Sequence, residues 1–270
     1  MHGPQHEPPA ITSRRNPLVA RFRDAASDTS TEVMLLDGAH LLGEALDANI
    51  EVTDVAIASE AAAGEELTAL RRRVPHALLV SQSVLDAMSP ARSPSGVVAL
   101  ARRPADGTAR MFAGASSLVV VACDIQDPGN VGAILRSAEA GGATGVIVTS
   151  GSADPFGWKA LRGAMGSAFR LPVARFGADD SALALARTRG LCIVATVGRG
   201  GTPMAQADLT GPLALLVGGE GAGLPASLIE AADLQVTIPM TPPVESLNVA
   251  VATALLVFEA RRQRAAVSTR

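Results

Sequence analysis

The alternation of apolar and polar residues divides the chain into short strands and helices. In the first hundred residues, apolar runs with strand spacing alternate with stretches of helical spacing. The pattern predicts strands at 32–36, 53–58, 76–80 and 96–100, and helices at 38–47, 64–73 and 83–88. Together these elements indicate a small α/β unit of about 90 residues, an ordinary size for a domain.

A second alternation of strands and helices begins with a purely apolar run. It predicts strands at 117–123, 145–148, 191–196, 213–217 and 235–238, and helices at 131–140, 155–163, 182–189 and 247–262. A strand that is apolar at every position belongs inside a parallel sheet that is covered on both faces. The second half of the chain is therefore expected to be an α/β domain built on a parallel sheet.

Composition shifts suggest where the chain divides. Residues 1–13 are polar and rich in proline, which is typical of a disordered arm. The first α/β unit is expected at 14–101, and the stretch 102–114, with proline, glycine and charge, is a candidate linker. The second domain then occupies 115–270.

Length and composition limit the class of protein. Hydrophobic residues make up 48% of the 270, so most of the chain is expected to fold. No apolar run approaches the roughly 20 residues that a membrane span needs, and the first ten residues do not resemble a secretory signal. A cytoplasmic protein without membrane contact is expected. Cys123 and Cys192 lie in apolar strand-like runs and are predicted to be buried; with only four histidines in the chain, no metal site is expected.

Charge leaves the question of a nucleic-acid partner open. The net charge is −3, which does not indicate nucleic-acid binding. Lys159 is the only lysine, so the other cations are arginines, which suit bidentate phosphate contacts. With 3% aromatic residues and no tyrosine, base stacking on aromatic side chains is not expected to dominate.

Three segments of the second domain are more specific than a scaffold requires. The first is DPGNVGAILR, residues 127–136, in which Asn130 is placed to cap a helix and Arg136 lies within that helix. An ordinary capped helix with an arginine reaching water explains this segment equally well. The second, LLVGGEGAGLP at 215–225, runs from a strand into a glycine-rich loop that contains Glu220. Its spacing fits neither the dinucleotide fingerprint nor the phosphate loop, and a flexible turn is the simpler alternative.

The third segment, IPMTPPVESLNVAVA at 238–252, joins a strand to the C-terminal helix. Ser246 or Asn248 is placed to cap that helix. An amphipathic helix explains the apolar positions beyond residue 248 but leaves the proline-rich loop before it unexplained.

In this order the three segments resemble the motifs of the SpoU, or TrmH-type, branch of the SPOUT RNA methyltransferases. The match runs from about Ser117 to the end of the chain. The preceding domain resembles the family's RNA substrate-binding domain, which is similar to kink-turn-binding ribosomal proteins. The resemblance implies an α/β domain with a deep trefoil knot, S-adenosylmethionine as the methyl donor, and a ribose 2′-hydroxyl as the acceptor.

The resemblance also implies a set of site residues. Donor-binding residues would be Gly218, Gly219, Ile238, Met240 and Leu247, and the catalytic set would be Asn130, Arg136, Glu220, Ser246 and Asn248. The family's proton acceptor corresponds to Arg136. Because a guanidinium does not normally lose a proton, Arg136 would need help from the substrate phosphate, and positioning of phosphate and ribose is the alternative role.

Family members act as homodimers on RNA, so the resemblance implies a second copy and an RNA substrate, with ribosomal RNA favoured over transfer RNA. Candidate phosphate contacts are Arg14, Arg15, Arg21, Arg23, Arg92 and Arg162, although a solvated surface charge explains each one singly. A nucleotide-dependent oxidoreductase and a catalytically silent RNA-binding protein are the competing interpretations. The first has only the glycine loop in its support, and the intact polar set argues against the second.

Overall fold

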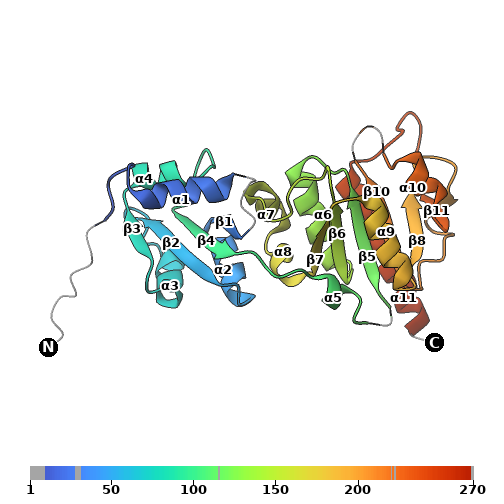
Figure 1. Cartoon of the computed structure of the whole chain (residues 1–270), viewed down its shortest axis with the longest axis horizontal. Coiled ribbons are helices and arrows are strands. Elements are labelled where there is room, and N and C mark those ends of the chain that lie inside the picture. The colour runs from blue at the N-terminus through green and yellow to red at the C-terminus, as the bar shows by residue number, and fades with distance from the viewer. Residues whose placement is uncertain (1–9, 28–31, 115, 220, 222, 269–270) are drawn as a thin grey trace. The chain divides into compact units, whose positions relative to one another are not determined.

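The computed structural model describes residues 10–27, 32–114, 116–219, 221 and 223–268. The chain divides into two compact units (Figure 1). The first comprises residues up to Pro104 together with 156–158, and the second comprises 105–155 and 159–270. Asn16 caps the first helix, since its Oδ1 accepts a hydrogen bond from the Leu18 amide at 2.9 Å, and the helix begins with Pro17. The apolar and polar pattern did not predict this helix.

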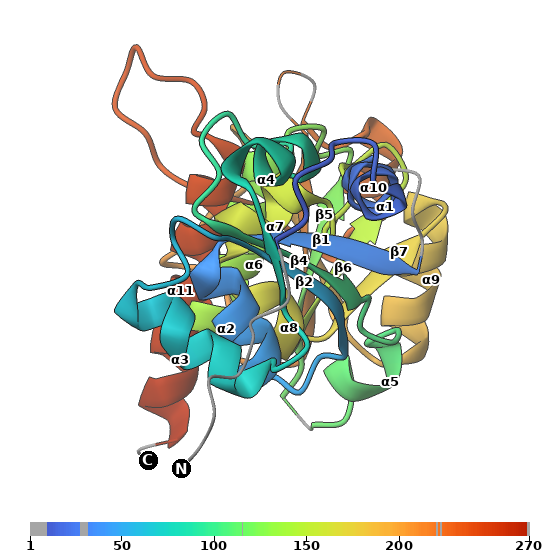
Figure 2. The same cartoon turned by 90° about the vertical axis from the view of Figure 1, so that its left-hand side faces the viewer.

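The first unit is a four-stranded mixed sheet with helices on both faces. Its strands are β1 (Val33–Asp37), β2 (Val52–Ala58), β3 (Leu78–Val80) and β4 (Val97–Arg102), in the spatial order β1-β4-β2-β3. Its helices are α1 (Pro17–Ala26), α2 (Ala39–Asp47), α3 (Glu65–Arg73) and α4 (Gln82–Met88). Helices α1 and α4 cover one face, where Phe22, Leu85 and Leu100 are buried together, and α2 and α3 lie on the other face (Figure 2).

The second unit is built on a seven-stranded sheet in which every described strand pair is parallel. Its strands are β5 (Leu118–Cys123), β6 (Gly145–Thr149), β7 (Val173–Phe176), β8 (Cys192–Thr196), β9 (Thr202–Pro203), β10 (Leu213–Gly218) and β11 (Leu234–Thr237). The spatial order is β7-β6-β5-β10-β8-β11-β9. The predicted parallel α/β sheet is confirmed, and β5 lies inside it with all six residues buried.

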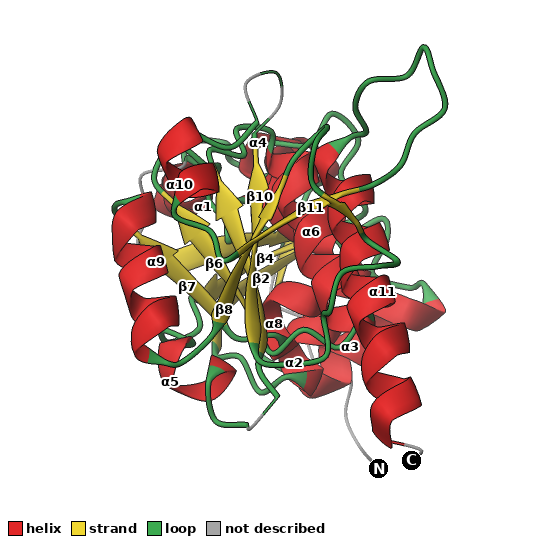
Figure 3. Ribbon diagram, turned by 90° about the vertical axis from the view of Figure 1, so that its right-hand side faces the viewer, coloured by secondary structure: helices red, strands yellow, loops and turns green. Residues whose placement is uncertain are grey.

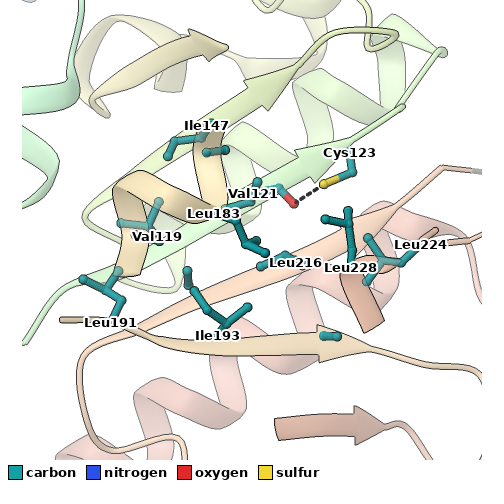
Figure 4. Close-up of a cluster of buried hydrophobic side chains, with 14 of the residues drawn as sticks. Val119, Val121, Cys123, Ile147, Leu183, Leu191, Ile193, Leu216, Leu224 and Leu228 are labelled. Atoms are coloured by element: carbon teal, nitrogen blue, oxygen red, sulfur yellow. Dashed lines mark hydrogen bonds between the residues drawn. The ribbon is translucent and has the colours of Figure 1, made fainter. Parts of the chain in front are cut away.

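Helices cover both faces of this sheet. They are α5 (Thr108–Met111), α6 (Pro128–Ala140), α7 (Trp158–Ala164), α8 (Ser167–Arg170), α9 (Asp179–Thr188), α10 (Ala226–Glu230) and α11 (Val249–Ser268). Figure 3 shows α9 and α10 on one side of the strands and α6 and α11 on the other. Between the strands and α9, a cluster of buried side chains that includes Val121, Ile147, Leu183 and Leu216 forms the core (Figure 4).

Three local predictions differ from the structure. The expected linker 102–114 contains the short helix α5, and Met111 at its end is fully buried, because Met111 and the neighbouring Phe112 pack against the core of the second unit and anchor the helical turn there. Cys192 is exposed rather than buried, since it is the first residue of β8 and the residues that follow it turn inward. The helix that starts the first motif is capped by Asp127, not by Asn130.

Cys123 is buried in the core, as expected. Burial is the main cause that raises the pKa of its thiol, so the group stays protonated and uncharged. In this state it packs as a small apolar side chain.

One arginine fixes the far end of α11 to the sheet. Arg264 donates to the carbonyl oxygens of Ser116 at 2.8 Å and Leu209 at 3.1 Å, which precede β5 and β10. Its guanidinium also donates to the carbonyls of Ser117 and Gly211. Because four loop carbonyls depend on one side chain, α11 is held along the strands whose opposite ends form the site below.

None of the described helices combines the length and the apolar character that crossing a membrane requires.

Candidate active site

The site lies where three parallel strands end. Strands β8 and β10 are hydrogen-bonded neighbours and β11 pairs with β8 on its other side, so their carboxyl ends share one edge of the sheet. Helix α11 packs against α6 and β10, and β8 separates β10 from β11 in the sheet. The segment 238–248 must therefore cross back over the ends of β8 and β10 to reach α11, and it forms the long loop between β11 and α11 in Figure 3.

These segments enclose a cavity of about 650 Å³, within the usual range for small-molecule sites. All five residues predicted to bind the donor line it: Gly218, Gly219, Ile238, Met240 and Leu247. Ser246 and Asn248, from the predicted catalytic set, line it as well. The remaining described lining residues are Thr196, Val197, Gly198, Val217, Gly221, Gly223, Leu224, Val236, Val249, Ala252 and Leu256.

The residues at the end of β8 were missed by sequence reasoning. Thr196, Val197 and Gly198 follow a buried strand, and the only signal was a glycine just beyond it. That signal becomes informative only when β8 is known to lie beside β10, which is a property of the sheet order.

Two positions of the glycine-rich loop require glycine, because backbone atoms of other residues pack closely against them. A Cβ on Gly218 would lie 2.3 Å from backbone atoms of Gly223 and Leu224, and one on Gly219 would lie 2.1 Å from the carbonyl oxygen of Asp124. The loop folds back so that the Gly223 amide donates to the Gly219 carbonyl at 3.2 Å. The two glycines therefore bring the loop close enough to its neighbours to leave the cavity open above it.

The first and third motifs meet through two asparagines that are 118 residues apart in the chain. Asn248 Nδ2 donates to Asn130 Oδ1 at 3.0 Å. Asn248 Oδ1 caps α11 by accepting from the amides of Ala250 at 2.9 Å and Val251 at 3.3 Å. Because the cap requires the oxygen of Asn248, its nitrogen must face Asn130, and this fixes which way the Asn130 amide points.

Helix α6 is positioned by the glycine of the first motif. A Cβ on Gly132 would lie 2.3 Å from the Ala160 carbonyl oxygen and 2.9 Å from the Ala164 nitrogen, both on α7. Asp127 Oδ1 accepts from the Asn130 amide at 2.9 Å and so caps α6. The close helix crossing and the cap together set where the Asn130 side chain lies.

One member of the predicted catalytic set, Arg136, is not brought into this arrangement. Glu220 lies outside the described residues. Arg136 is exposed, does not line the cavity, and has no hydrogen bond or ion pair to any described residue. It lies six residues beyond Asn130, about 9 Å along the helix and about a third of a turn around it.

The arginines suggested for RNA contact fall into two groups. Arg14 and Arg23 donate through Nε to the carbonyls of Ser83 and Ala87, and Arg21 forms a bidentate pair with Asp54 at 2.9 and 3.1 Å. The other three have exposed side chains that are unpaired within the described part of the chain: Arg15, Arg92 and Arg162.

The cavity suits a ligand with an apolar ring and polar edges. Ile238, Leu247 and Leu256 offer apolar surface, and the backbone amides of Ile238, Met240 and Leu247 make no hydrogen bond to any described residue. Free amides beside apolar side chains can read the edge of a heterocyclic base while its face is covered. These features fit the adenosine part of S-adenosylmethionine.

The fold and the site define a protein that binds a nucleoside-containing ligand at the carboxyl edge of a parallel sheet. The profile of the SpoU rRNA methylase family matches residues 117–258, and the profile described as the N terminus of thiostrepton-resistance methylase matches 8–115. The chain belongs to the SpoU rRNA methylase family, which confirms the resemblance seen in its motifs.

Three known proteins illustrate the similarity over nearly the whole chain. An uncharacterised tRNA/rRNA methyltransferase of Synechocystis is 36% identical over 265 residues, 96% of each chain. The 23S rRNA (guanosine(2553)-2′-O)-methyltransferase RlmP of Bacillus subtilis is 33% identical, covering 86% of this chain and 90% of the relative. The crystal structure of the SpoU methyltransferase AviRb from Streptomyces viridochromogenes, in complex with AdoMet, has a TM-score of 0.85 at 28% identity, covering 93% and 99% of the two chains.

Proposed function

We propose that this protein transfers a methyl group from S-adenosylmethionine to a ribose 2′-hydroxyl of structured RNA, with ribosomal RNA as the favoured substrate. The observation that carries the proposal is the cavity in which the second and third motifs meet, with the first motif joined to it through the Asn130–Asn248 hydrogen bond. The name of the Bacillus subtilis relative supports ribosomal RNA and the 2′-oxygen as the target.

The donor would occupy the cavity with its adenosine part against Ile238 and Leu247 and with its base edge at the free amides. When bound, its sulfonium makes the methyl group electrophilic, so the chain itself must supply the position of the acceptor and a place for its proton. Correct positioning alone can lower the barrier by ~7–11 kcal/mol.

Asn130, Ser246 and Asn248 would form the polar wall beside the acceptor ribose. Asn248 holds the amide of Asn130 in one orientation, and Ser246 lies two residues before Asn248 at the cavity. Glu220 would complete this wall from the glycine-rich loop. A wall already fixed by its own hydrogen bonds needs little reorganisation when the ribose arrives.

Arg136 would hold the phosphate and ribose of the RNA; acceptance of the 2′-hydroxyl proton is its alternative role, which would need help from the substrate phosphate. Its exposure supports contact with a substrate that arrives from solvent. Because Arg136 does not line the cavity of its own chain, a second copy of the protein is a natural route for it to reach a bound donor.

A homodimer is part of the proposal, and α11 is the expected interface. Val251, Leu255 and Phe258 are 49%, 39% and 47% exposed and lie at i, i+4 and i+7, so they form one apolar stripe on this helix. The stripe adjoins Leu247, which lines the cavity and is itself 38% exposed. A two-fold contact between such stripes would bury them and bring each site close to the interface.

The trefoil knot of the family is also proposed for this chain. Its support is the return of segment 238–248 across the ends of β8 and β10 before α11 packs beside α6. The first unit would bind the RNA substrate, with Arg15 and Arg92 among its exposed cations. A cytoplasmic location is also part of the proposal, and RNA as the substrate supports it.

The test is transfer of a labelled methyl group to ribosomal RNA by the wild type, Arg136→Ala and the control Arg110→Ala, an exposed arginine on α5. We expect Arg136→Ala to lose ~10²–10⁴-fold in rate, the contribution typical of acid–base catalysis, while donor binding and the melting temperature stay close to wild type. Near wild-type turnover would remove Arg136 from the mechanism. A wild type that binds the donor but transfers nothing would instead indicate the silent RNA-binding protein.

A further inference from the structure

Two arginines of the first unit are held in place by neutral groups. Arg14 Nε donates to the Ser83 carbonyl at 2.9 Å, and Arg23 Nε donates to the Ala87 carbonyl at 2.8 Å. Arg14 precedes α1 and Arg23 lies in its last turn, and both side chains reach across to α4, which packs beside α1 (Figure 1). A carbonyl oxygen fixes a guanidinium without cancelling its charge, so these two anchored arginines, Arg14 and Arg23, remain full cations.

Other arginines of the same unit are compensated by carboxylates. Arg21 on α1 forms an ion pair with Asp54 at 2.9 Å. Arg73 on α3 forms one with Asp47 at 2.8 Å. Within the described residues, neither anchored arginine has an ion-pair partner. The anchored arginines are therefore better placed than these paired ones to attract an anion from solution.

The hydrogen bond through Nε leaves the outer edge of each anchored guanidinium open. That edge carries both Nη groups, and they make no hydrogen bond to any part of the chain that the structure describes. Two parallel N–H groups on a rigid plane match two oxygens of a phosphate. Because the Nε bond already fixes the plane, binding a phosphate costs less side-chain entropy than it would for an arginine free in solvent.

Helix α4 sets the spacing of the anchored arginines. Ser83 and Ala87 are four residues apart on this helix, so their carbonyl groups lie one turn apart on the same face, about 6 Å along the axis. Successive phosphates along a nucleic-acid strand are separated by a similar distance. Arg15, next to Arg14 in the chain, is exposed and adds a further cation at that end.

Two acids are close to the anchored arginines in the chain, and neither neutralises them. Asp86 on α4 accepts a hydrogen bond at its Oδ1 from Gln82 Nε2 at 2.7 Å. Asp24 follows Arg23 on α1, where consecutive residues are about 100° apart around the helix and so point in different directions. The face that α1 and α4 form therefore keeps two fixed cations for an outside partner.

We propose that the α1–α4 face of the first unit binds the RNA backbone, with Arg14 and Arg23 holding neighbouring phosphates of one strand. The inference rests on the proposed function, since that function supplies RNA as the partner. Both arginines are positioning residues, because they fix where the substrate lies and touch no reacting atom. Phosphate contacts carry no sequence information, so this face sets the register of the RNA and leaves recognition of the nucleotide to other contacts.

The salt dependence of RNA binding by the full chain tests this assignment. Each phosphate contact contributes about 0.7–0.9 to the slope of log affinity against log salt concentration. With ribosomal RNA transcribed in vitro, we expect Arg14→Gln and Arg23→Gln each to reduce the slope by that amount, and the double variant to reduce it by about 1.4–1.8. The KM for this RNA should rise about three- to tenfold in each single variant, while kcat and the affinity for S-adenosylhomocysteine stay within about twofold of wild type.

Lysine variants and an arginine on the other face of the sheet are the matched controls. Arg14→Lys and Arg23→Lys keep the charge, so they should retain the slope and recover much of the KM. Arg73→Gln removes one charge from α3 and should change the slope by less than about 0.3. All of these variants should have melting temperatures close to that of the wild type, because a glutamine or lysine side chain can still donate to a carbonyl.

The results distinguish this inference from the proposed function. If the double variant keeps the wild-type slope, or if Arg73→Gln reduces the slope as much as Arg14→Gln does, the α1–α4 face is not the phosphate-binding surface, whereas methyl transfer by the wild type still stands. If the lysine variants lose as much slope as the glutamine variants, the arginines act through local structure and the inference is wrong. If the wild type transfers no methyl group but the slope falls as expected, the proposed function fails and the RNA-binding face remains.

Discussion

Replacing Asn248 separates its role as a helix cap from its contact with the first motif. Asn248→Ala removes the oxygen that caps α11 and the nitrogen that donates to Asn130. Loss of a cap costs about 1 kcal/mol and loss of a partly exposed hydrogen bond about 1 kcal/mol more. We therefore expect a decrease of about 2 kcal/mol in the free energy of unfolding of the second unit.

Asn248→Asp provides the matched comparison. A carboxylate caps the helix as well as an amide does and lies favourably at its positive end, so stability should stay within about 1 kcal/mol of wild type. The donor to Asn130 is lost, however, and the Asn130 amide must turn over to present its own nitrogen. We expect this variant to be folded but strongly impaired in methyl transfer.

Unfolding in urea followed by far-ultraviolet circular dichroism is the appropriate assay. Fluorescence would be misleading, because the only tryptophan, Trp158, belongs to the first unit. If Asn248→Ala were as stable as wild type, or if Asn248→Asp lost as much stability as Asn248→Ala, the cap would not be what holds the start of α11. Full activity of Asn248→Asp would show that the orientation of the Asn130 amide does not matter.

Two further predictions concern packing and pH. Gly132→Ala would place a Cβ against the Ala160 carbonyl and should cost about 1–3 kcal/mol in urea unfolding, whereas Gly114→Ala, with no heavy atom within 4 Å of its new Cβ, should be nearly neutral. Hydrogen bonds from Arg262 lower the pKa of Glu259 from 4.5 to about 2, so the stability that this carboxylate contributes is complete above pH 4.5 and declines as the pH falls toward 2. Glu259→Gln should lower the stability near neutrality and flatten the stability–pH curve in that window, so that the variant and the wild type converge as the pH falls toward 2.

Local pattern was sufficient for most elements of both units. The apolar run at 118–123 predicted a strand buried on both faces, and β5 is the strand between β6 and β10. Several elements that the pattern did not predict are short or polar, such as β7 with its exposed Arg175 and the four-residue helix α5. Their position depends on a few anchors, such as Met111, which a local pattern does not single out.

The helix caps also show which features follow from the local sequence and which depend on the tertiary structure. The pattern predicts Asn130 as the cap of α6 and Ser246 or Asn248 as the cap of α11. Asp127 rather than Asn130 caps α6, and Asn248 rather than Ser246 caps α11. Because Asp127 caps α6, the Asn130 side chain is available to accept a hydrogen bond from Asn248. These two residues are too far apart in the chain for a local pattern to predict that hydrogen bond.

The sequence by itself determined most element types, the parallel α/β class and, through three ordered motifs, the family, because strand and helix spacing and motif residues are local properties of the chain; it also supplied the residues proposed to bind the donor. Only the tertiary structure decided that the end of β8 lines the cavity and that Gly132 serves a helix crossing. These features depend on the order of strands in the sheet and on the return of segment 238–248 across it. Both are set by burial of apolar surface over the whole domain, which no short stretch of sequence specifies.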